Sequence, residues 1–241
     1  MAKIHTLPSV QSTNTWAKEH AATLSHGEVV LTHCQTSGRG QRGNSWEAEP
    51  GKNLTFSLFL TPTALPPARQ FEISEAVALG VAETVERHIG RTVRVKWPND
   101  IYVDDRKIAG ILIEHSLSGN RIAHTVAGVG LNVNQTRFLS DAPNPVSMAN
   151  IAGREFEFTP LLNEICDNIL HRLEETLPGQ RHTMFLEKLW RNDGEQHTFA
   201  TPDGAHFEAR IAHVGTDGIL TLVTSTGEKR TFAFKEVAFI L

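Results

Sequence analysis

TVRVKWPNDIYVDDRKIAGILIEHSLSGNRIAHTVAGVGLNV, the stretch from Thr92 to Val133, contains the densest β-strand signal of the chain. It predicts strands at 92–96, 101–103, 107–115 and 122–133. A corner at 97–100 that contains proline, and short turns at 104–105 and 118–120, separate these strands. Because strands joined by such short turns must be antiparallel neighbours, the stretch predicts an antiparallel sheet.

The residues that precede this stretch predict two helices and two strands. Ser12 suits the N-cap position of a helix over 12–24, and a strand follows over 28–35. Apolar residues alternate with other residues over 54–60, which predicts a strand with one buried face. An apolar residue at every fourth position over 73–89 predicts a helix with one apolar face, which ends at Gly90.

The residues that follow the stretch divide into a helical part and a β part. Two helices are predicted at 160–176 and 181–191. Short strands are then predicted at 197–200, 207–214, 218–223 and 229–234, separated by turns rich in Gly, Asp and Ser. This spacing is typical of a small β-barrel. The expected domains are therefore residues 1–191 and residues 192–241.

Composition excludes several classes of protein. Of the 241 residues, 40% are hydrophobic and 21% are charged, which is typical of a globular chain and not of a disordered or fibrous one. The net charge of −4 argues against a general nucleic-acid binder. Cys34 and Cys166 are the two cysteines and stand far apart, so a disulfide scaffold or a zinc ribbon is not expected. No apolar run is long enough to span a bilayer, and we expect a cytoplasmic protein with no membrane partner.

A loop rich in glycine and arginine follows the strand at 28–35. Residues 38–43 match the pattern GxGxxG, but residues 44–51 are poor helix formers, so a Rossmann dinucleotide site is rejected. What remains is a loop in which backbone amides and two guanidinium groups, those of Arg39 and Arg42, could contact an anion. A solvated surface loop is the alternative.

A second group of residues favours a ligand site. Lys96, Asn99 and Asp100 surround the corner, Lys107 starts the KIAG run 107–110, and the run GVGLN occupies 128–132. Glycines weaken strands unless a ligand or another backbone must come close. A single strand lysine is usually solvated, but Lys96, Lys107, Asp100 and Asn132 are expected to converge with strand glycines on one sheet face, which favours a ligand site.

These motifs, in this order and spacing, resemble those of biotin protein ligases (biotin–[acetyl-CoA-carboxylase] ligases). The resemblance rests on the loop 38–43 with Trp46, on KWPND at 96–100, on KIAG at 107–110 and on GVGLN at 128–132. It covers about residues 5–190, and the C-terminal β module is similar to the SH3-like domain of the family. It implies an α+β fold: a mixed, largely antiparallel sheet backed by helices, related to class II synthetase catalytic domains, followed by a small SH3-like β-barrel.

The resemblance also implies an activity in two steps. Biotin and ATP, with Mg²⁺, give biotinyl-AMP and diphosphate, and the biotinyl group then passes to a lysine of a biotin carboxyl carrier protein domain with release of AMP. Both steps develop charge on phosphate oxygens, which fixed cations stabilise, and neither step needs a nucleophile from the enzyme. Catalytic roles are expected for Lys107, Arg39, Lys96 and Asp100, and Asp100 is the expected Mg²⁺ ligand or the partner of Lys96.

The resemblance assigns the remaining site residues to two ligands. The expected biotin-binding residues are Ser12, Thr13, Asn14 and Gln35 at the ureido end, with Arg39, Gly40, Gln41, Lys107 and Gly110 along the rest of the molecule. The expected ATP-binding residues are Arg42, Trp46, Asn99, Asn132 and Gly130, with Trp46 stacked on adenine. The best-known members of the family carry Arg where this chain has Gln41, so one cation of the loop is missing.

Three matters concern the type of ligase and its rivals. Residues 1–11 are too short for a helix-turn-helix unit, so a monofunctional ligase that does not bind DNA is expected. The rival functions are a non-enzymatic biotin or nucleotide sensor and a related lipoyl or octanoyl transferase with Cys34 as nucleophile, although a strand cysteine is usually a small buried apolar group. Monomer and homodimer both stay open.

Overall fold

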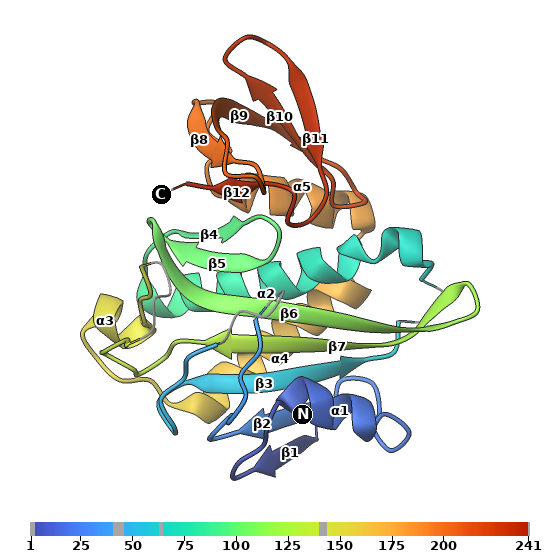
Figure 1. The fold of residues 1–241 in the computed structure, drawn as a ribbon. Coiled ribbons are helices and arrows are strands. Elements are labelled where there is room, and N and C mark those ends of the chain that lie inside the picture. The colour runs from blue at the N-terminus through green and yellow to red at the C-terminus, as the bar shows by residue number, and fades with distance from the viewer. Residues whose placement is uncertain (1–2, 41–45, 63–64, 140–143, 241) are drawn as a thin grey trace.

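The computed structural model describes residues 3–40, 46–62, 65–139 and 144–240, and it has two sheets. The larger sheet lies at the centre of the molecule, with long helices packed behind it (Figure 1). The smaller sheet lies above it and is formed by the C-terminal residues. The two sheets follow each other in the chain, and α5 (Pro178–Lys188) lies between them in sequence.

The larger sheet has seven strands in the order β1-β2-β3-β7-β6-β5-β4. Their bounds are β1 (Ile4–Leu7), β2 (Val29–Thr32), β3 (Leu54–Leu60), β4 (Val93–Lys96), β5 (Asp100–Val103), β6 (Arg106–Ser118) and β7 (Arg121–Leu131). Strands β1 and β2 are parallel, and every other neighbouring pair is antiparallel. The predicted mixed, largely antiparallel sheet is confirmed.

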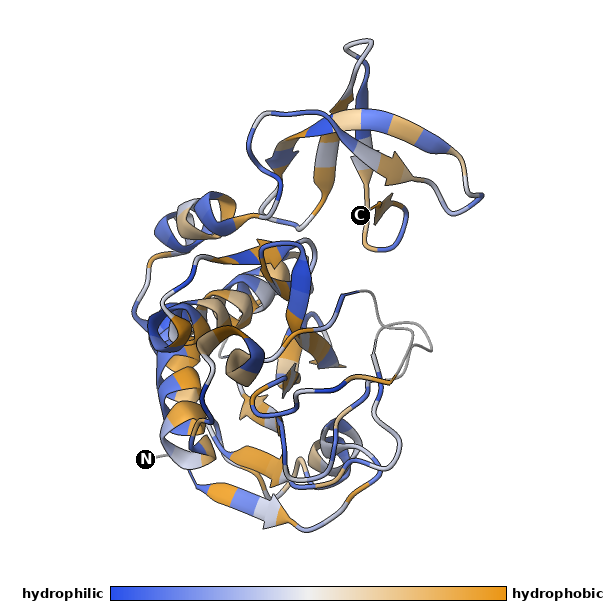
Figure 2. Cartoon of the chain, turned by 90° about the vertical axis from the view of Figure 1, so that its left-hand side faces the viewer, coloured by the Kyte–Doolittle hydropathy of each residue, from blue (hydrophilic) through white to orange (hydrophobic). Residues whose placement is uncertain are grey.

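Helices α2 (Phe71–Ile89) and α4 (Phe158–Glu174) pack against each other and cover one face of this sheet (Figure 1), and apolar residues recur along the helices of the molecule (Figure 2). The predicted end of α2 is confirmed, because Gly90 caps it with a positive φ of 64°. Burial of α2 extends beyond the single apolar face that the sequence predicts. Nearly every residue from Phe71 to Val85 is buried, because the sheet, α4 and α5 enclose the helix.

Helix α1 (Thr13–Glu19) covers the opposite face of the sheet, where it contacts β3 and β7. The Ser12 side chain accepts a hydrogen bond from Thr15 N and forms the predicted N-cap. The helix ends earlier than predicted. The prediction of a strand with one buried face at 54–60 is wrong, because all seven residues of β3 are buried between the helix layer and the α1 side.

The C-terminal sheet is antiparallel, has the order β11-β10-β9-β8-β12 and fits an SH3-like domain. Its strands are β8 (His197–Ala200), β9 (His206–Val214), β10 (Leu220–Thr224), β11 (Lys229–Phe232) and β12 (Ala238–Phe239). Trp97, which follows β4 of the larger sheet, contacts this C-terminal sheet region. Its indole Nε1 donates to Gly218 O at 2.9 Å, and its ring lies 5.4 Å from that of Phe234.

Three short elements were not predicted from the sequence: β1, β12 and α3 (Met148–Ala152). Each has five residues or fewer, which is too short for a periodic pattern to emerge. A 3-10 turn at Pro67–Arg69 precedes α2. Across the described ranges, no helix has both the length and the apolar character needed to cross a membrane.

Candidate active site

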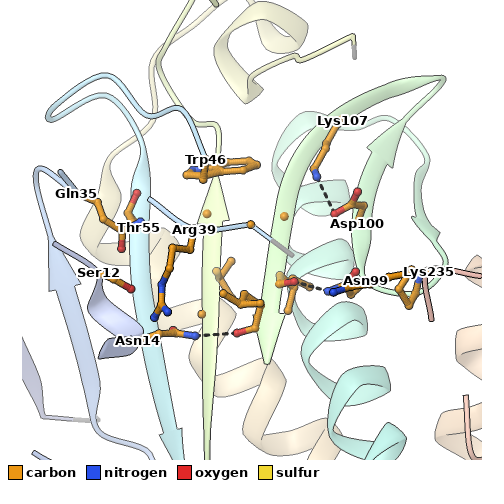
Figure 3. A pocket seen from close by; sticks show the side chains of 18 of the residues that line it. Ser12, Asn14, Gln35, Arg39, Trp46, Thr55, Asn99, Asp100, Lys107 and Lys235 are labelled. Carbon is orange, nitrogen blue, oxygen red and sulfur yellow. Dashed lines mark hydrogen bonds and ion pairs between the residues drawn. The ribbon is translucent and has the colours of Figure 1, made fainter. Parts of the chain in front are cut away.

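A cavity of about 430 Å³ opens on the α1 side of the larger sheet, and residues in or next to both sheets line it. The corner 98–100 and strands β3, β6 and β7 form its floor, while the start of α1 and the loop after β2 contribute to its walls. Figure 3 separates two ends, one with Ser12, Asn14 and Gln35 and the other with Asp100, Lys107 and Lys235.

Lys107 and Asp100 form an ion pair at the second end. Lys107 Nζ lies 2.8 Å from Asp100 Oδ1, and both side chains are only partly exposed, at 22% and 29%. The pairing follows from the register of the hairpin, since Asp100 and Lys107 both lie near the bulge where β5 pairs with β6. The cavity therefore offers a fixed cation beside a carboxylate.

Trp46 lies flat against the strand glycines at the centre of the cavity (Figure 3). A Cβ atom on Gly130 would be 2.5 Å from Trp46 Cε2 and Nε1, and one on Gly110 would be 3.0 Å from Cζ3. The strand glycines thus make room for an aromatic ring, as their presence inside strands predicts. The ring lies 5.6 Å from Lys107 Nζ, and its own Nε1 has no hydrogen-bond partner among the described residues.

The first end is polar and its groups are held by hydrogen bonds. Ser57 Oγ on β3 donates to Asn14 Oδ1 at 2.6 Å and also lies 2.8 Å from Thr13 Oγ1. Gln35 Oε1 accepts from Thr13 N at 2.9 Å. Asn14 is 3% exposed, and a Cβ on Gly128 would lie 2.3 Å from its Oδ1. Small polar groups with fixed directions therefore line this end.

Arg39 reaches toward the first end and away from Lys107 (Figure 3). Its Nη2 donates to Thr15 Oγ1 at 2.7 Å and lies 3.8 Å from Glu114 Oε2. The loop that carries Arg39 is held at both sides of its undescribed part, because Trp46 N donates to Gly38 O at 3.0 Å. Gln41 and Arg42 lie outside the described residues.

Most of the site residues that the sequence predicts line this one cavity. They are Ser12, Thr13, Asn14, Gln35, Arg39, Gly40, Trp46, Asn99, Asp100, Lys107, Gly110 and Gly130. Asn99 is buried and its amide donates to Ile111 O, which fixes the corner against β6.

Lys96 and Asn132 do not line the cavity. Lys96 donates to the Tyr102 hydroxyl at 3.1 Å and lies within 6 Å of the rings of Tyr102, Trp190 and Phe239. Burial lowers the pKa of Lys96, although the charge of Asp100 opposes this. Asn132 is 2% exposed behind β7, and its amide donates to Val146 O.

Sequence reasoning missed the contribution of the C-terminal domain. Other residues of the C-terminal sheet and its loops also line the cavity: Ala200 at the end of β8, Thr201 and Pro202 after it, and Lys235, Val237 and Ala238. Lys235 has a φ of 76°, which is a rare conformation for a residue other than glycine and is often found at functional sites. That φ value is not visible in a sequence. Thr55, Phe56 and Leu112 were also missed, because a residue on a strand face carries no motif.

Two rival chemistries, a metal centre held by several side chains and catalysis by a cysteine nucleophile, find little support in the described part of the chain. It contains no group of three or more His, Cys, Asp or Glu side chains that could hold a metal ion. Asp100 is the one carboxylate among the described lining residues. Cys34 is free and does not line the cavity, and Cys166 is buried, which raises the pKa of its thiol to about 12.

Comparisons with known proteins agree on one family. Residues 6–132, more than half of the chain, match the model of the biotin/lipoate A/B protein ligase family. The bifunctional ligase/repressor BirA of Escherichia coli is 36% identical over 131 residues, which cover 54% of this chain and 40% of BirA. The biotin–[acetyl-CoA-carboxylase] ligase of Paracoccus denitrificans is 36% identical over 131 residues, or 53% of each chain. The chain thus spans about half the length of these relatives or less.

Similarity to a solved structure extends over both sheets. The biotin protein ligase of Aquifex aeolicus in complex with biotin and ATP superposes with a TM-score of 0.82 at 23% identity, covering 99% of this chain and 98% of that one. At this level of identity the likeness establishes the fold. It includes the second sheet, so the C-terminal module is a regular part of that architecture.

Proposed function

Since the chain belongs to the biotin/lipoate A/B protein ligase family, we propose that it is an ATP-dependent biotin protein ligase. Its substrates would be biotin, ATP and one lysine of a biotin carboxyl carrier protein domain. Relatives named as biotin–[acetyl-CoA-carboxylase] ligases, and a biotin protein ligase of the same fold in complex with biotin and ATP, support this proposal.

The polar first end of the cavity favours biotin over lipoate as the ligand. The ureido ring of biotin offers two N–H donors and one carbonyl acceptor, whereas the dithiolane ring of lipoate offers no N–H group. Ser12, Thr13, Asn14 and Gln35 line this end, and Ser57 bonds to two of them. A buried polar wall left without partners is costly, so it selects a ligand with matching polar groups.

Activation of biotin brings two negatively charged groups together, the biotin carboxylate and the α-phosphate of ATP. The biotin carboxylate attacks the α-phosphorus of ATP, the bond to the β-phosphate oxygen breaks, and biotinyl-AMP and diphosphate result. Lys107 lies beside Asp100 at 2.8 Å and would hold the carboxylate next to the α-phosphate while offsetting their repulsion. Arg39, now on Thr15 and Glu114, would supply a second cation.

ATP would occupy the end of the cavity next to Lys107. Trp46 offers a flat ring for adenine, and Gly110 and Gly130 give that ring its place. Mg²⁺ commonly binds through one or two carboxylates together with phosphate oxygens, and Asp100 is a carboxylate that faces this end. Bound there with ATP, the ion would neutralise phosphate charge.

Transfer completes the reaction. The ε-amine of the carrier lysine attacks the biotinyl carbonyl, loses a proton and displaces AMP, so no enzyme nucleophile takes part. We further propose a cytoplasmic location, since ATP is available there and the free Cys34 and Cys166 suit a reducing compartment. We also propose that residues 1–191 and 192–241 are the two domains.

Mass spectrometry of a carrier domain tests the function. The purified chain is incubated with the carrier domain, ATP, Mg²⁺ and one acid, which is biotin, lipoate or octanoate. We expect the mass increment of biotin on one lysine, with release of diphosphate and AMP. Modification by lipoate or octanoate in preference to biotin would contradict the substrate, and binding of biotin without any modification would indicate a sensor.

Two variants complete this experiment. Lys107→Ala should slow formation of biotinyl-AMP by about 10²-fold or more, because a cation aimed at developing charge is worth this much. Cys34→Ser should leave the rate within about twofold, since this thiol lies off the cavity. An acyl transferase that uses Cys34 as its nucleophile would show the reverse pattern.

A further inference from the structure

Glu114 lies on the cavity face of β6 but is not itself among the residues that line the cavity. Side chains of a strand alternate between faces, so Gly110, Leu112 and Glu114 share the face that carries Trp46 and Asn14. The Glu114 side chain is 25% exposed and lies just beyond the polar first end. Neither a sequence motif nor the proposed reaction gives it a role.

Three side chains from two other segments converge on this carboxylate. Asn14 Nδ2 donates to Glu114 Oε2 at 2.9 Å, and Lys18 Nζ donates to Oε1 at 2.6 Å. Asn14 and Lys18 are one turn apart on α1. Arg39 Nη2, from the loop, lies 3.8 Å from Oε2. Each carboxylate oxygen therefore has its own hydrogen-bond donor.

These contacts determine which way the Asn14 amide points. Its Nδ2 donates to two groups that can only accept, Leu112 O at 3.0 Å and the Glu114 carboxylate. Both N–H bonds are thereby used, so Oδ1 faces the opposite way, toward Gly128 and Ser57. Asn14 thus presents a hydrogen-bond acceptor to the cavity.

The carboxylate must stay ionised to hold the amide in this direction, since a protonated carboxyl could itself donate. Burial alone would raise the pKa of Glu114. Hydrogen bonds from Lys18 and Asn14 and the charges of Lys18 and Arg39 outweigh burial and hold that pKa below its usual range. Glu114 is therefore ionised, and an acceptor, at neutral pH.

We propose that Glu114 is a positioning residue for biotin: by accepting from Asn14 Nδ2, it fixes the Asn14 carbonyl as an acceptor for a ureido N–H. The inference rests on the proposed function and adds to it a residue outside the cavity wall. Asn14 and Lys18 each donate to a different oxygen of Glu114, and a glutamine would replace one of these oxygens by an NH2 group that can only donate. A glutamine has one oxygen, which Lys18 and Asn14 would have to share.

Calorimetric titration of biotin alone into the full-length chain tests this role. We expect Glu114→Gln to weaken biotin binding about tenfold, which is the value of one lost or reversed hydrogen bond. Lys18→Met should bind biotin like the wild type. In the double variant the single glutamine oxygen is free to accept from Asn14, so we expect affinity to return to within about threefold of the wild type.

Glu155→Gln is the matched control. Glu155 pairs with Lys52 at 3.4 Å, is exposed, and lies off the cavity, so its variant should bind biotin normally. Unchanged affinity in Glu114→Gln would overturn the inference, and so would a double variant that binds no better than Glu114→Gln. A wild-type chain that does not bind biotin would overturn the proposed function instead.

Discussion

Gly130 has no room for a side chain beneath Trp46. A Cβ at this position would be 2.5 Å from two atoms of the indole, and Trp46 is a side chain that can move away. We therefore expect Gly130→Ala to leave the fold intact and to displace the ring. If Trp46 stacks on adenine, the KM for ATP should rise about three- to tenfold, which corresponds to an aromatic contact of about 1 kcal/mol. The KM for biotin should change little.

Steady-state measurement of diphosphate release, with ATP and biotin varied in turn, checks this expectation. Gly179→Ala is the control, because a Cβ on Gly179 meets nothing within 4 Å. An equal rise in both KM values would mean that the alanine disturbs the whole cavity and not the Trp46 platform.

The part of the site that could be predicted from the sequence consists of charged residues and of glycines inside strands. Lys107, Asp100 and the strand glycines could be predicted because a cation, a carboxylate and missing side chains have few other uses at such positions. Lys96 stands in the same motif, yet it lies among Tyr102, Trp190 and Phe239. In the antiparallel pairing of β4 with β5, Lys96 and Asp100 stand opposite each other. The sequence does not show which of the two side chains faces the cavity.

At the scale of elements, α2 and α4 pack closely at Gly80. A Cβ there would lie 2.6 Å from Ile169 Cγ1 and 2.7 Å from Ile169 N, and the backbone nitrogen can move only with its helix. Alanine favours helix more than glycine, but the helices would have to separate. We expect Gly80→Ala to lower the free energy of unfolding by about 1–3 kcal/mol.

Urea denaturation followed by circular dichroism measures this loss. Gly179→Ala, in the first turn of α5, adds a Cβ that would meet nothing within 4 Å and should raise stability by at most about 1 kcal/mol. A Gly80→Ala variant as stable as the wild type would show that α4 can move aside at little cost.

The order of the elements could be predicted because each long helix and strand has its own period. Burial on the second face of an element could not. Strand β3 alternates apolar residues with Thr55, Ser57 and Phe59, which suggests an exposed face, yet α1 and the cavity cover that face. Ser57 is buried there with its hydroxyl bonded to Thr13 and Asn14, which come from a segment more than forty residues away.

At the scale of the whole molecule, the cavity is completed by a domain whose sequence contains no motif. Lys235 and Thr201 lie at the cavity because Trp97, Phe71 and Phe234 hold the C-terminal sheet over the corner. The residues of the motif KWPND therefore act in two ways. Trp97 bonds to Gly218 O and holds the C-terminal sheet in place, while Asn99 and Asp100 line the cavity. A motif reveals that its residues matter but not which of them bind a ligand.

Trp97→Phe separates these two purposes. It keeps an aromatic ring but removes the hydrogen bond to Gly218 O in a buried contact, which should weaken docking of the C-terminal sheet by about 1–3 kcal/mol. Lys235 lies near Asn99 and away from Ser12 and Gln35 (Figure 3), so the end proposed for ATP should suffer and the biotin end should not. We expect the KM for ATP to rise at least about threefold, with the biotin Kd unchanged.

Limited proteolysis gives a second readout, because looser docking should expose the segment between α5 and β8, at 189–196, to faster cleavage. Trp16→Phe is the control: among the described ring pairs Trp16 contacts His5 and His20, and none of its ring partners belongs to the C-terminal sheet. If Trp97→Phe weakened biotin binding as much as ATP binding, the corner would act on the site by its own shape, and the second domain would not be what completes the cavity.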